Sequence, residues 1–196
     1  MNIITYTAIT NNKDNNRPEL DFCFQSYDKF KDPRLNAKIY KILPHLFIPG
    51  HEWSIWVDGN VFLNVNPIKL INELKIHNKD IGVFKHTERD CLYEEARVCT
   101  KWNLDNEHFI NRQVSRYSDC SFPEHNGLYM CFLIIRRNTE YIRRKCEQWW
   151  CEITAGSVRD QISFPFVFND LNHIHVFEDG VIAGNCKWYT RTPHSK

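Results

Sequence analysis

The sequence contains few glycines, 7 in 196 residues, and none of them forms a phosphate-binding loop. The patterns G-x-G-x-x-G and G-x-x-x-x-G-K are both missing, which argues against dinucleotide-binding and P-loop folds. No segment is repeated or of low complexity, and no apolar run is long enough to span a bilayer. The net charge is only +1, so the chain lacks the overall positive field that attracts nucleic acid or an acidic membrane. We therefore expect no nucleic-acid partner and no membrane span, and local groups must bind any anionic ligand.

Cysteine pairs at metal-binding or redox spacing are also missing. The eight cysteines include no Cys-x-x-Cys pair, which argues against a zinc ribbon and against a thioredoxin-type redox site. The first residues carry no basic segment and turn polar by Thr10, unlike a secretory signal peptide. We therefore expect reduced cysteines in the core and a cytoplasmic location.

What is present is the composition of an ordinary globular protein, with 42% hydrophobic and 25% charged residues. The length fits one domain over residues 1–196. Apolar and β-branched runs alternate with segments of helical periodicity. The pattern predicts strands at 2–9, 22–27, 53–57, 81–85, 127–135 and 173–177, and helices at 34–47 (interrupted at Pro44), from 67, at 90–102, at 105–117 and from Asn138 to Gly156. This alternation predicts an α/β sandwich with a mostly parallel sheet, followed by a polar tail from Lys187.

The most informative segment is the buried strand at 53–57 with the sequence Asp58-Gly59-Asn60 that ends it. An apolar run that stops at a carboxylate places that carboxylate at the carboxyl end of a strand, where ligands bind in open α/β sheets. A carboxylate followed by a glycine and a second oxygen-bearing side chain suits a hard divalent cation that carries phosphate. A simple turn is the alternative, because Asp-Gly is also a hairpin signal.

A second acidic group is predicted to be buried on the helix at 90–102. There Glu95 shares a face with apolar residues, whereas Glu94 faces solvent. A buried carboxylate needs a partner, and an arginine, a metal, a hydroxyl or a substrate would serve. A structural ion pair and a functional site explain Glu95 equally well. The two glutamates diverge by about 100° around the helix, so they do not form a cooperating pair of acids.

Basic groups follow the strand at 81–85, which ends on the same sheet edge as Asp58. Lys85, His86 and Arg89 on that rim could bind a phosphate or a sugar carboxylate. A solvated loop would have the same composition.

The segment at 157–161 admits two interpretations. Its Ser-x-x-Asp pattern is typical of a helix cap. Pro165 favours a later helix start near Phe164, which would leave Asp160 and Gln161 in a loop and free to contact a ligand. A late histidine, such as His194 in the tail, could complete a metal site, although a single histidine is more often structural or exposed.

Read in order, these segments resemble one known family. The matching residues begin with Arg34, Lys41-Ile42-Leu43-Pro44 and Ser54-Ile55-Trp56-Val57-Asp58-Gly59-Asn60, continue with Lys85-His86, Arg89-Asp90, Tyr93-Glu94-Glu95-Ala96, Gln113 and Tyr117, and end with Arg136-Arg137-Asn138-Thr139, Trp149-Trp150 and Arg159-Asp160-Gln161-Ile162-Ser163-Phe164. The pattern is similar to a glycosyltransferase-like domain family, formerly a domain of unknown function, known from plant mucilage-related and turgor-regulation proteins. The likeness runs collinearly from Arg34 to about Phe168.

The resemblance implies a GT-A-type fold, an α/β/α sandwich whose Asp-x-Asp motif holds Mn²⁺ or Mg²⁺ and the diphosphate of a nucleotide-sugar. Asp58 and Asn60 match the first and last positions of that motif. Asn60 offers a neutral oxygen where many such enzymes have a second carboxylate, so we expect either a lower metal affinity or a metal site completed by a histidine elsewhere, such as His194. Asp160 and Gln161 are similar to the Asp-Gln pair that lines the donor-sugar pocket in several of these enzymes.

The implied reaction is the transfer of a sugar from a UDP- or GDP-linked donor to a glycan or another acceptor. The roles expected from the resemblance are contacts with base and ribose for Thr5, Thr7 and Ala8, contacts with the substrate for Arg34, Lys41, Lys85, His86, Arg89 and Gln161, and orientation of donor hydroxyls or deprotonation of the acceptor for Glu95 or Asp160. Two alternatives stay open. One is a non-catalytic nucleotide- or glycan-binding module of the same fold, and the other is a hydrolase that uses Glu95 and Asp160 as paired acids.

Overall fold

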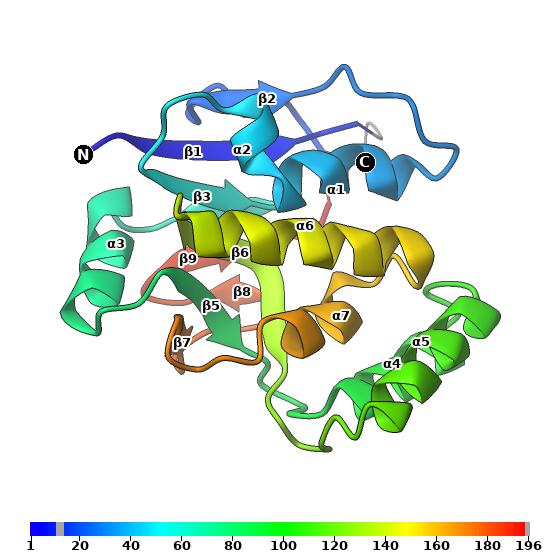
Figure 1. Cartoon of the computed structure of the whole chain (residues 1–196). Helices are drawn as coiled ribbons and strands as arrows, with labels where there is room; N and C mark the ends of the chain where they lie inside the picture. Colours follow the sequence, from blue (N-terminus) through cyan, green and yellow to red (C-terminus); the bar gives the residue numbers. More distant parts are fainter. Residues whose placement is uncertain (11–13, 195–196) are drawn as a thin grey trace.

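The computed structural model describes residues 1–10 and 14–194, which form an α/β fold around a six-stranded sheet (Figure 1). The strand order is β2-β1-β3-β6-β5-β7. The bounds are Ile3–Ala8 for β1, Phe22–Phe24 for β2, Trp53–Val57 for β3, Ile81–Lys85 for β5, Tyr129–Arg137 for β6 and Ile174–Phe177 for β7. β1 runs parallel to β2 and β3, and β5 runs parallel to β7, whereas β6 is antiparallel to both of its neighbours. The predicted α/β class is confirmed, with a mixed sheet that is mostly parallel.

One face of the sheet is covered by helices, which bury the larger apolar core against it. These helices are α1 (Pro33–Ile42), α2 (Pro44–Phe47), α6 (Glu140–Ala155) and α7 (Asp160–Val167). Trp149 of α6 is fully buried in this core, and its indole Nε1 donates to the Ser163 hydroxyl at 3.0 Å. Trp149 therefore serves core packing.

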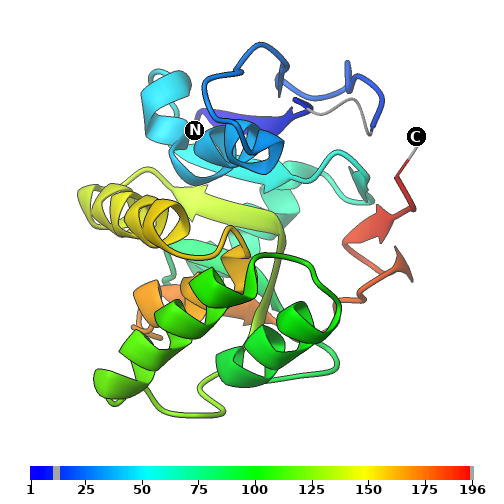
Figure 2. The same ribbon diagram turned by 90° about the vertical axis from the view of Figure 1, so that its right-hand side faces the viewer.

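The other face is covered by α3 (Pro67–Ile76) and by a small antiparallel sheet. The small sheet has the order β4-β9-β8, with β4 at Val61–Leu63, β8 at Gly184–Asn185 and β9 at Tyr189–Arg191. Figure 2 shows β9 on the side of the main sheet opposite α6. The prediction of a polar tail from Lys187 is wrong here, because Trp188 and Tyr189 are buried and Thr192 N donates to Asn60 O at 3.0 Å.

A third helical layer lies beyond the end of the sheet, where α4 (Leu92–Lys101) packs against α7 and α5 (Glu107–Asp119) packs against α4. Several predicted helix ends are confirmed. Asn66 caps α3 by accepting from Ile68 N, with Pro67 in the first helical position, and Gly156 ends α6. The cap of α6 is Thr139 instead of Asn138, since the threonine hydroxyl accepts from Ile142 N at 3.2 Å.

Among the residues that the structure describes, no helix combines the length and the apolar character needed to cross a bilayer.

The topology brings four chain segments to one edge of the sheet. β1, β3 and β5 run in the same direction, so Ile9, Asp58 and His86 leave the sheet at this edge. β6 is antiparallel and therefore begins there, which adds Met130. The predicted placement of Asp58 beside the segment after β5 is confirmed by this arrangement.

Candidate functional site

A cavity of about 450 Å³ opens at this edge of the sheet, between α1, α4, α7 and the C-terminal segment. Most of the predicted site residues line it, namely Ala8, Arg34, Lys41, Asp58, His86, Arg89, Glu95, Asp160, Gln161 and His194. Residues from both ends of the chain and from its middle thus meet in one place. The volume lies in the range that small-molecule sites occupy in proteins.

Asp58 sits directly after β3 at the wall of this cavity. Its Oδ1 accepts a hydrogen bond from the indole Nε1 of Trp56 at 2.7 Å. Alternation along the strand puts residues 56 and 58 on the same side, so the indole fixes the rotamer of the carboxylate. The Asp58 side chain remains one-third exposed, in contrast to the fully buried strand before it. A carboxylate held in one orientation and still open to the cavity can meet a ligand.

Lys41 joins Asp58 to Asp160 across the cavity. Its Nζ lies 3.2 Å from Asp58 Oδ1 and 2.7 Å from Asp160 Oδ2, and its side chain is 4% exposed. Lys38, one turn earlier on α1, places its Nζ 2.8 Å from the same Asp160 oxygen. Two ammonium groups and two carboxylates therefore form one cluster, of which Asp58 is the most exposed member. Lys38 was not among the predicted site residues, although its i,i+3 spacing from Lys41 puts the two lysines on one helix face.

The electrostatics of this cluster follow from burial and pairing. Burial alone would raise the pKa of the Asp160 carboxyl, but Lys38 and Lys41 hold it well below its ordinary value. Burial would likewise lower the pKa of Lys41, but Asp160 and Asp58 together raise it. For Lys38 burial prevails and, together with the charge of Lys41, lowers the pKa against the opposing effect of Asp160. Asp160 is consequently ionised at neutral pH and is a weak base.

The start of α7 differs from both interpretations of the sequence. The helix begins at Asp160, and the Arg159 side chain makes no capping hydrogen bond. The Ser157 hydroxyl donates to Asp105 instead of capping α7. Pro165 lies inside the helix, where it removes one backbone hydrogen bond, but the surrounding residues are buried and the packing offsets that loss. Asp160 therefore stands in the first turn with its side chain directed to the two lysines.

Glu95 is buried on α4, as predicted, and its partner is an arginine. Arg89 Nη2 lies 2.9 Å from Glu95 Oε2, and the Cys99 thiol donates to Glu95 Oε1 at 3.4 Å. Arg89 also approaches His86 Nε2 at 3.3 Å. Burial lowers the pKa of His86, and Arg89 lowers it further, so the imidazole is neutral at pH 7. This second group of charges lines the same cavity as Asp58.

Four predicted site residues lie outside the cavity lining. The Thr5 hydroxyl donates to Asp21, and Thr7 is fully buried in the sheet. Lys85 is half-exposed and pairs with Glu178 at 2.9 Å. Asn60 Nδ2 donates to Thr192 O at 2.6 Å, and the residue lines a neighbouring cavity beside β8 and β9.

The C-terminal segment reaches the cavity through His194. Its Nδ1 lies 2.9 Å from Asp14 Oδ2, and both residues line the cavity together with Asp58. Asp14 was not predicted, because it lies in a polar segment that carries no motif. The side chain of Asp14 is 9% exposed, which is low for an aspartate in a loop.

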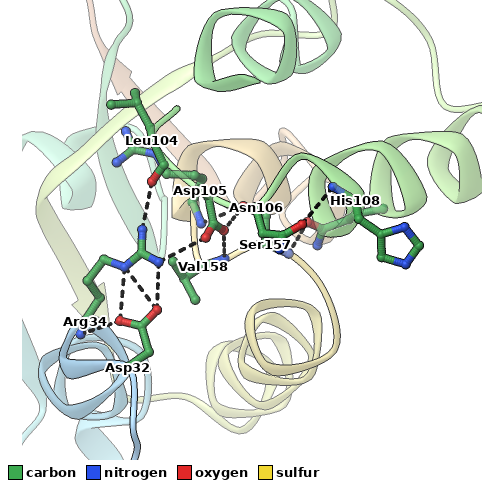
Figure 3. A network of polar contacts seen from close by, with 10 residues as sticks. Asp32, Arg34, Leu104, Asp105, Asn106, His108, Ser157 and Val158 are labelled. Atoms are coloured by element: carbon green, nitrogen blue, oxygen red, sulfur yellow. Dashed lines mark hydrogen bonds and ion pairs between the residues drawn. The ribbon is translucent and has the colours of Figure 1, made fainter. Parts of the chain in front are cut away.

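A network of polar contacts holds the loops around the cavity in place (Figure 3). Asp105, between α4 and α5, accepts from the Ser157 hydroxyl at 2.6 Å and from Val158 N at 2.8 Å. Arg34, at the start of α1, donates to Asp105 at 2.9 Å and to Leu104 O at 2.8 Å. The network ties the first turn of α1 to the loop that precedes Asp160. Three segments far apart in the sequence are thereby fixed relative to one another.

Removing the charge of Asp105 should weaken this network. Burial alone would raise the pKa of Asp105, but the hydrogen bonds from Ser157 and Val158 and the charge of Arg34 hold it below its ordinary value. The stabilisation is therefore present above the unfolded pKa near 4 and is lost as the pH falls below it. We expect Asp105→Asn to lower the free energy of unfolding by about 1–3 kcal/mol at pH 7. Urea unfolding at pH 7 and at pH 3 measures the difference.

The difference in the free energy of unfolding between wild type and Asp105→Asn should shrink at pH 3. An equal difference at both pH values would contradict a stabilising role for the charge of Asp105. Asp28→Asn removes the same charge from an exposed position, where the side chain is 83% exposed, and serves as the control.

The sequence is similar to one family of known proteins. A family model described as "TOD1/MUCI70, glycosyltransferase-like domain" matches residues 24–184. The chain is 26% identical over 176 residues to "Alkaline ceramidase TOD1" of Arabidopsis thaliana, covering 81% of this chain and 38% of that protein. It is also 26% identical over 147 residues to "Probable hexosyltransferase MUCI70" of the same plant, covering 70% of this chain and 25% of that protein. The chain thus spans well under half the length of either relative. No solved structure matches it.

Proposed function

Because this chain belongs to the TOD1/MUCI70 glycosyltransferase-like domain family, we propose that it transfers a hexosyl or related sugar from a nucleotide-sugar donor to a glycan or another acceptor. The observation that carries the proposal is the convergence of Asp58, Lys41 and Asp160 on one cavity. One relative is named a probable hexosyltransferase, which agrees with this assignment. The order of strands around an antiparallel β6 is compatible with the GT-A-type fold that we propose for it.

The cavity contains the charges that a sugar diphosphate requires. Lys38, Lys41, Arg34 and Arg89 supply positive charge in the lining of the cavity. An anionic diphosphate can replace a carboxylate as the partner of Lys41. Transfer breaks the bond between the anomeric carbon and the diphosphate, so negative charge develops on the leaving phosphate. Fixed cations in a site that excludes water stabilise this charge without reorganisation.

A divalent cation is the cofactor that the family implies, and the residues at the cavity fit one by their chemistry. Asp58, Asp14 and His194 all line the cavity and offer oxygen and nitrogen ligands that suit Mn²⁺. Their ligand atoms do not form one of the closely spaced clusters found among the described residues. Asn60, the third predicted ligand, lines the neighbouring cavity, and its buried Oδ1 has no hydrogen-bond partner among the described residues. A bound Mn²⁺ or Mg²⁺ would act as a Lewis acid toward the leaving diphosphate.

The two remaining acidic groups receive different roles. Asp160 is a weak base because of its depressed pKa, so we assign it to orienting Lys41 and the hydroxyl groups of the donor sugar. Glu95 remains the candidate that accepts the proton of the acceptor hydroxyl, with Arg89 holding it in position. In a hydrolase with Glu95 and Asp160 as the pair, Asp160 could act only as base or nucleophile, so the general acid would have to be Glu95, which is paired with Arg89. This alternative is less well supported.

Donor binding should raise the melting temperature. At a nucleotide concentration of 100 times Kd, binding adds about 2.7 kcal/mol, which corresponds to a rise of about 5–10 °C for a chain of this size. We expect UDP or GDP with Mn²⁺ to produce such a rise, and matching nucleotide-sugars to release nucleotide when an acceptor is added. Differential scanning fluorimetry and a nucleotide-release assay measure the two effects.

The same screen separates the alternatives. A binding module of this fold would show the thermal shift without nucleotide release. Ceramide hydrolysis is assayed in parallel, because one relative is named an alkaline ceramidase. The absence of a shift with every nucleotide, with and without metal, would overturn the proposed function.

A further inference from the structure

A cluster of two histidines and a glutamate lies away from the cavity, where the end of α3 meets the edge strand β7. Glu73, His77 and His175 each place one ligand atom within 4.8 Å of the others. None of the three lines the cavity at Asp58. Figure 1 shows α3 and β7 on the side of the molecule opposite α4 and α5.

The local fold explains why these side chains meet. Glu73 lies in the last turn of α3, and His77, four residues later, is the C-cap of that helix, so the two side chains lie on the same side of it. His175 is the register partner of Gly82 in the neighbouring strand β5. A Cβ on Gly82 would lie 2.8 Å from Leu74 of α3 and 3.2 Å from Phe177, so the glycine lets α3 pack closely on the sheet. This close approach carries the end of α3 over β7.

The two imidazoles are stacked, so their lone pairs, which lie in the ring planes, do not point at one common ion in this arrangement. Their ring centroids are 4.7 Å apart and their planes differ by 18°. Burial lowers the pKa of His175, and His77 and Lys79 lower it further against the opposing effect of Glu73. Lys79 is held by the carbonyl oxygens of Leu171 and Asn172, at 2.8 and 3.0 Å.

We propose that Glu73, His77 and His175 bind one Zn²⁺ ion, with a fourth coordination position open to water. Two imidazoles and one carboxylate form a borderline ligand set that Zn²⁺ prefers over hard cations such as Mg²⁺ and Ca²⁺. Zinc–ligand distances of about 2.0–2.1 Å in a tetrahedron require ligand atoms about 3.4 Å apart. His77 is exposed, and the proposal requires its side chain to turn out of the stack so that its ring nitrogen meets the other two ligand atoms.

The bound ion would join the C-terminal turn of α3 to the edge strand of the main sheet. β7 pairs with β5 alone in that sheet, so its second edge has no partner strand among the described residues. A metal bridge at this edge stabilises the folded state by the free energy of zinc binding. The site is independent of the proposed sugar transfer and is tested without it.

The test is a titration of the EDTA-treated whole chain with Zn²⁺ alone, followed by calorimetry and by melting temperature. We expect one zinc ion per chain at micromolar concentration and a melting temperature that rises with zinc concentration. His77→Gln and His175→Gln should each weaken binding by more than the 10–100-fold that follows loss of an outer-shell partner, and should remove the thermal shift. The circular dichroism of each variant without metal verifies that it folds.

A matched control lies on another surface of the chain. Asp90, Glu94 and His125 form a second cluster within the same distance limit, exposed and mostly acidic. His125→Gln should leave the stoichiometry and the thermal shift unchanged. Cobalt(II) substitution distinguishes binding at the proposed site from binding at the exposed thiols of Cys120 and Cys151. A thiolate ligand adds a strong near-ultraviolet band, which the proposed site lacks. Zinc binding that survives both histidine variants, that is lost in His125→Gln, or that shows the thiolate band would overturn the proposal.

Discussion

Replacement of Asp58 by asparagine should reduce the rate of sugar transfer by about 10²–10³-fold or more while the chain remains folded, because such losses follow removal of one group that stabilises transition-state charge. Asparagine keeps an oxygen that accepts from Trp56, so the local fold at the end of β3 survives. It loses the charge that pairs with Lys41 and the carboxylate that would hold a divalent ion. Steady-state kinetics with the donor found in the nucleotide screen measure kcat and KM separately.

The pattern of the kinetic loss distinguishes the role of Asp58 from general destabilisation. A fall in kcat with a normal melting temperature supports action on the leaving diphosphate. Asp28→Asn, which removes an exposed negative charge far along the chain from this strand, should keep the activity of the wild type. Activity of Asp58→Asn within threefold of the wild type would remove this residue from the mechanism.

Much of the site was predictable because strand ends and helix faces carry local signals. The apolar run before Asp58 predicts a buried strand that ends at a carboxylate, and the structure has that strand. The helical position of Glu95 predicts its burial, and it is 3% exposed. Both inferences depend on residues close together in the sequence, where the periodicity of 2 or 3.6 decides which side is buried.

The remainder of the site depends on contacts between distant segments. Lys41 pairs with Asp160, which is far away in the sequence, so no local periodicity predicts the contact. Asp14 lies beside His194 because the C-terminal segment folds back along the loop after Asp58. The polar composition of these two segments does not predict that they pack together. Trp188 and Tyr189 were the available signal, since two adjacent large aromatics are rarely left in a solvated tail.

Asp160→Asn should be the most destabilising single change in the site. It leaves the ammonium of Lys38 without its carboxylate and Lys41 with Asp58 alone. Removal of one partner from a buried ion pair costs about 3–5 kcal/mol, because the remaining charge stays desolvated. The pKa of Asp160 is depressed in the folded state, so its contribution is present above the unfolded pKa near 4 and is lost as the pH falls through and below that range. Urea unfolding at pH 7 and at pH 3 should give a large and then a smaller difference from the wild type.

A double mutant separates charge pairing from packing. Lys38→Met keeps an apolar stem of similar length and removes the charge that Asp160→Asn would leave without a partner. If the cluster is held by charge, Lys38→Met in the Asp160→Asn background should restore part of the lost free energy of unfolding, whereas it should destabilise the wild type. The interaction free energy for groups in direct contact is about 0.5–3 kcal/mol. Strictly additive effects in this cycle would mean that Asp160 supports the fold through its shape, and the electrostatic account of the cavity would then be wrong.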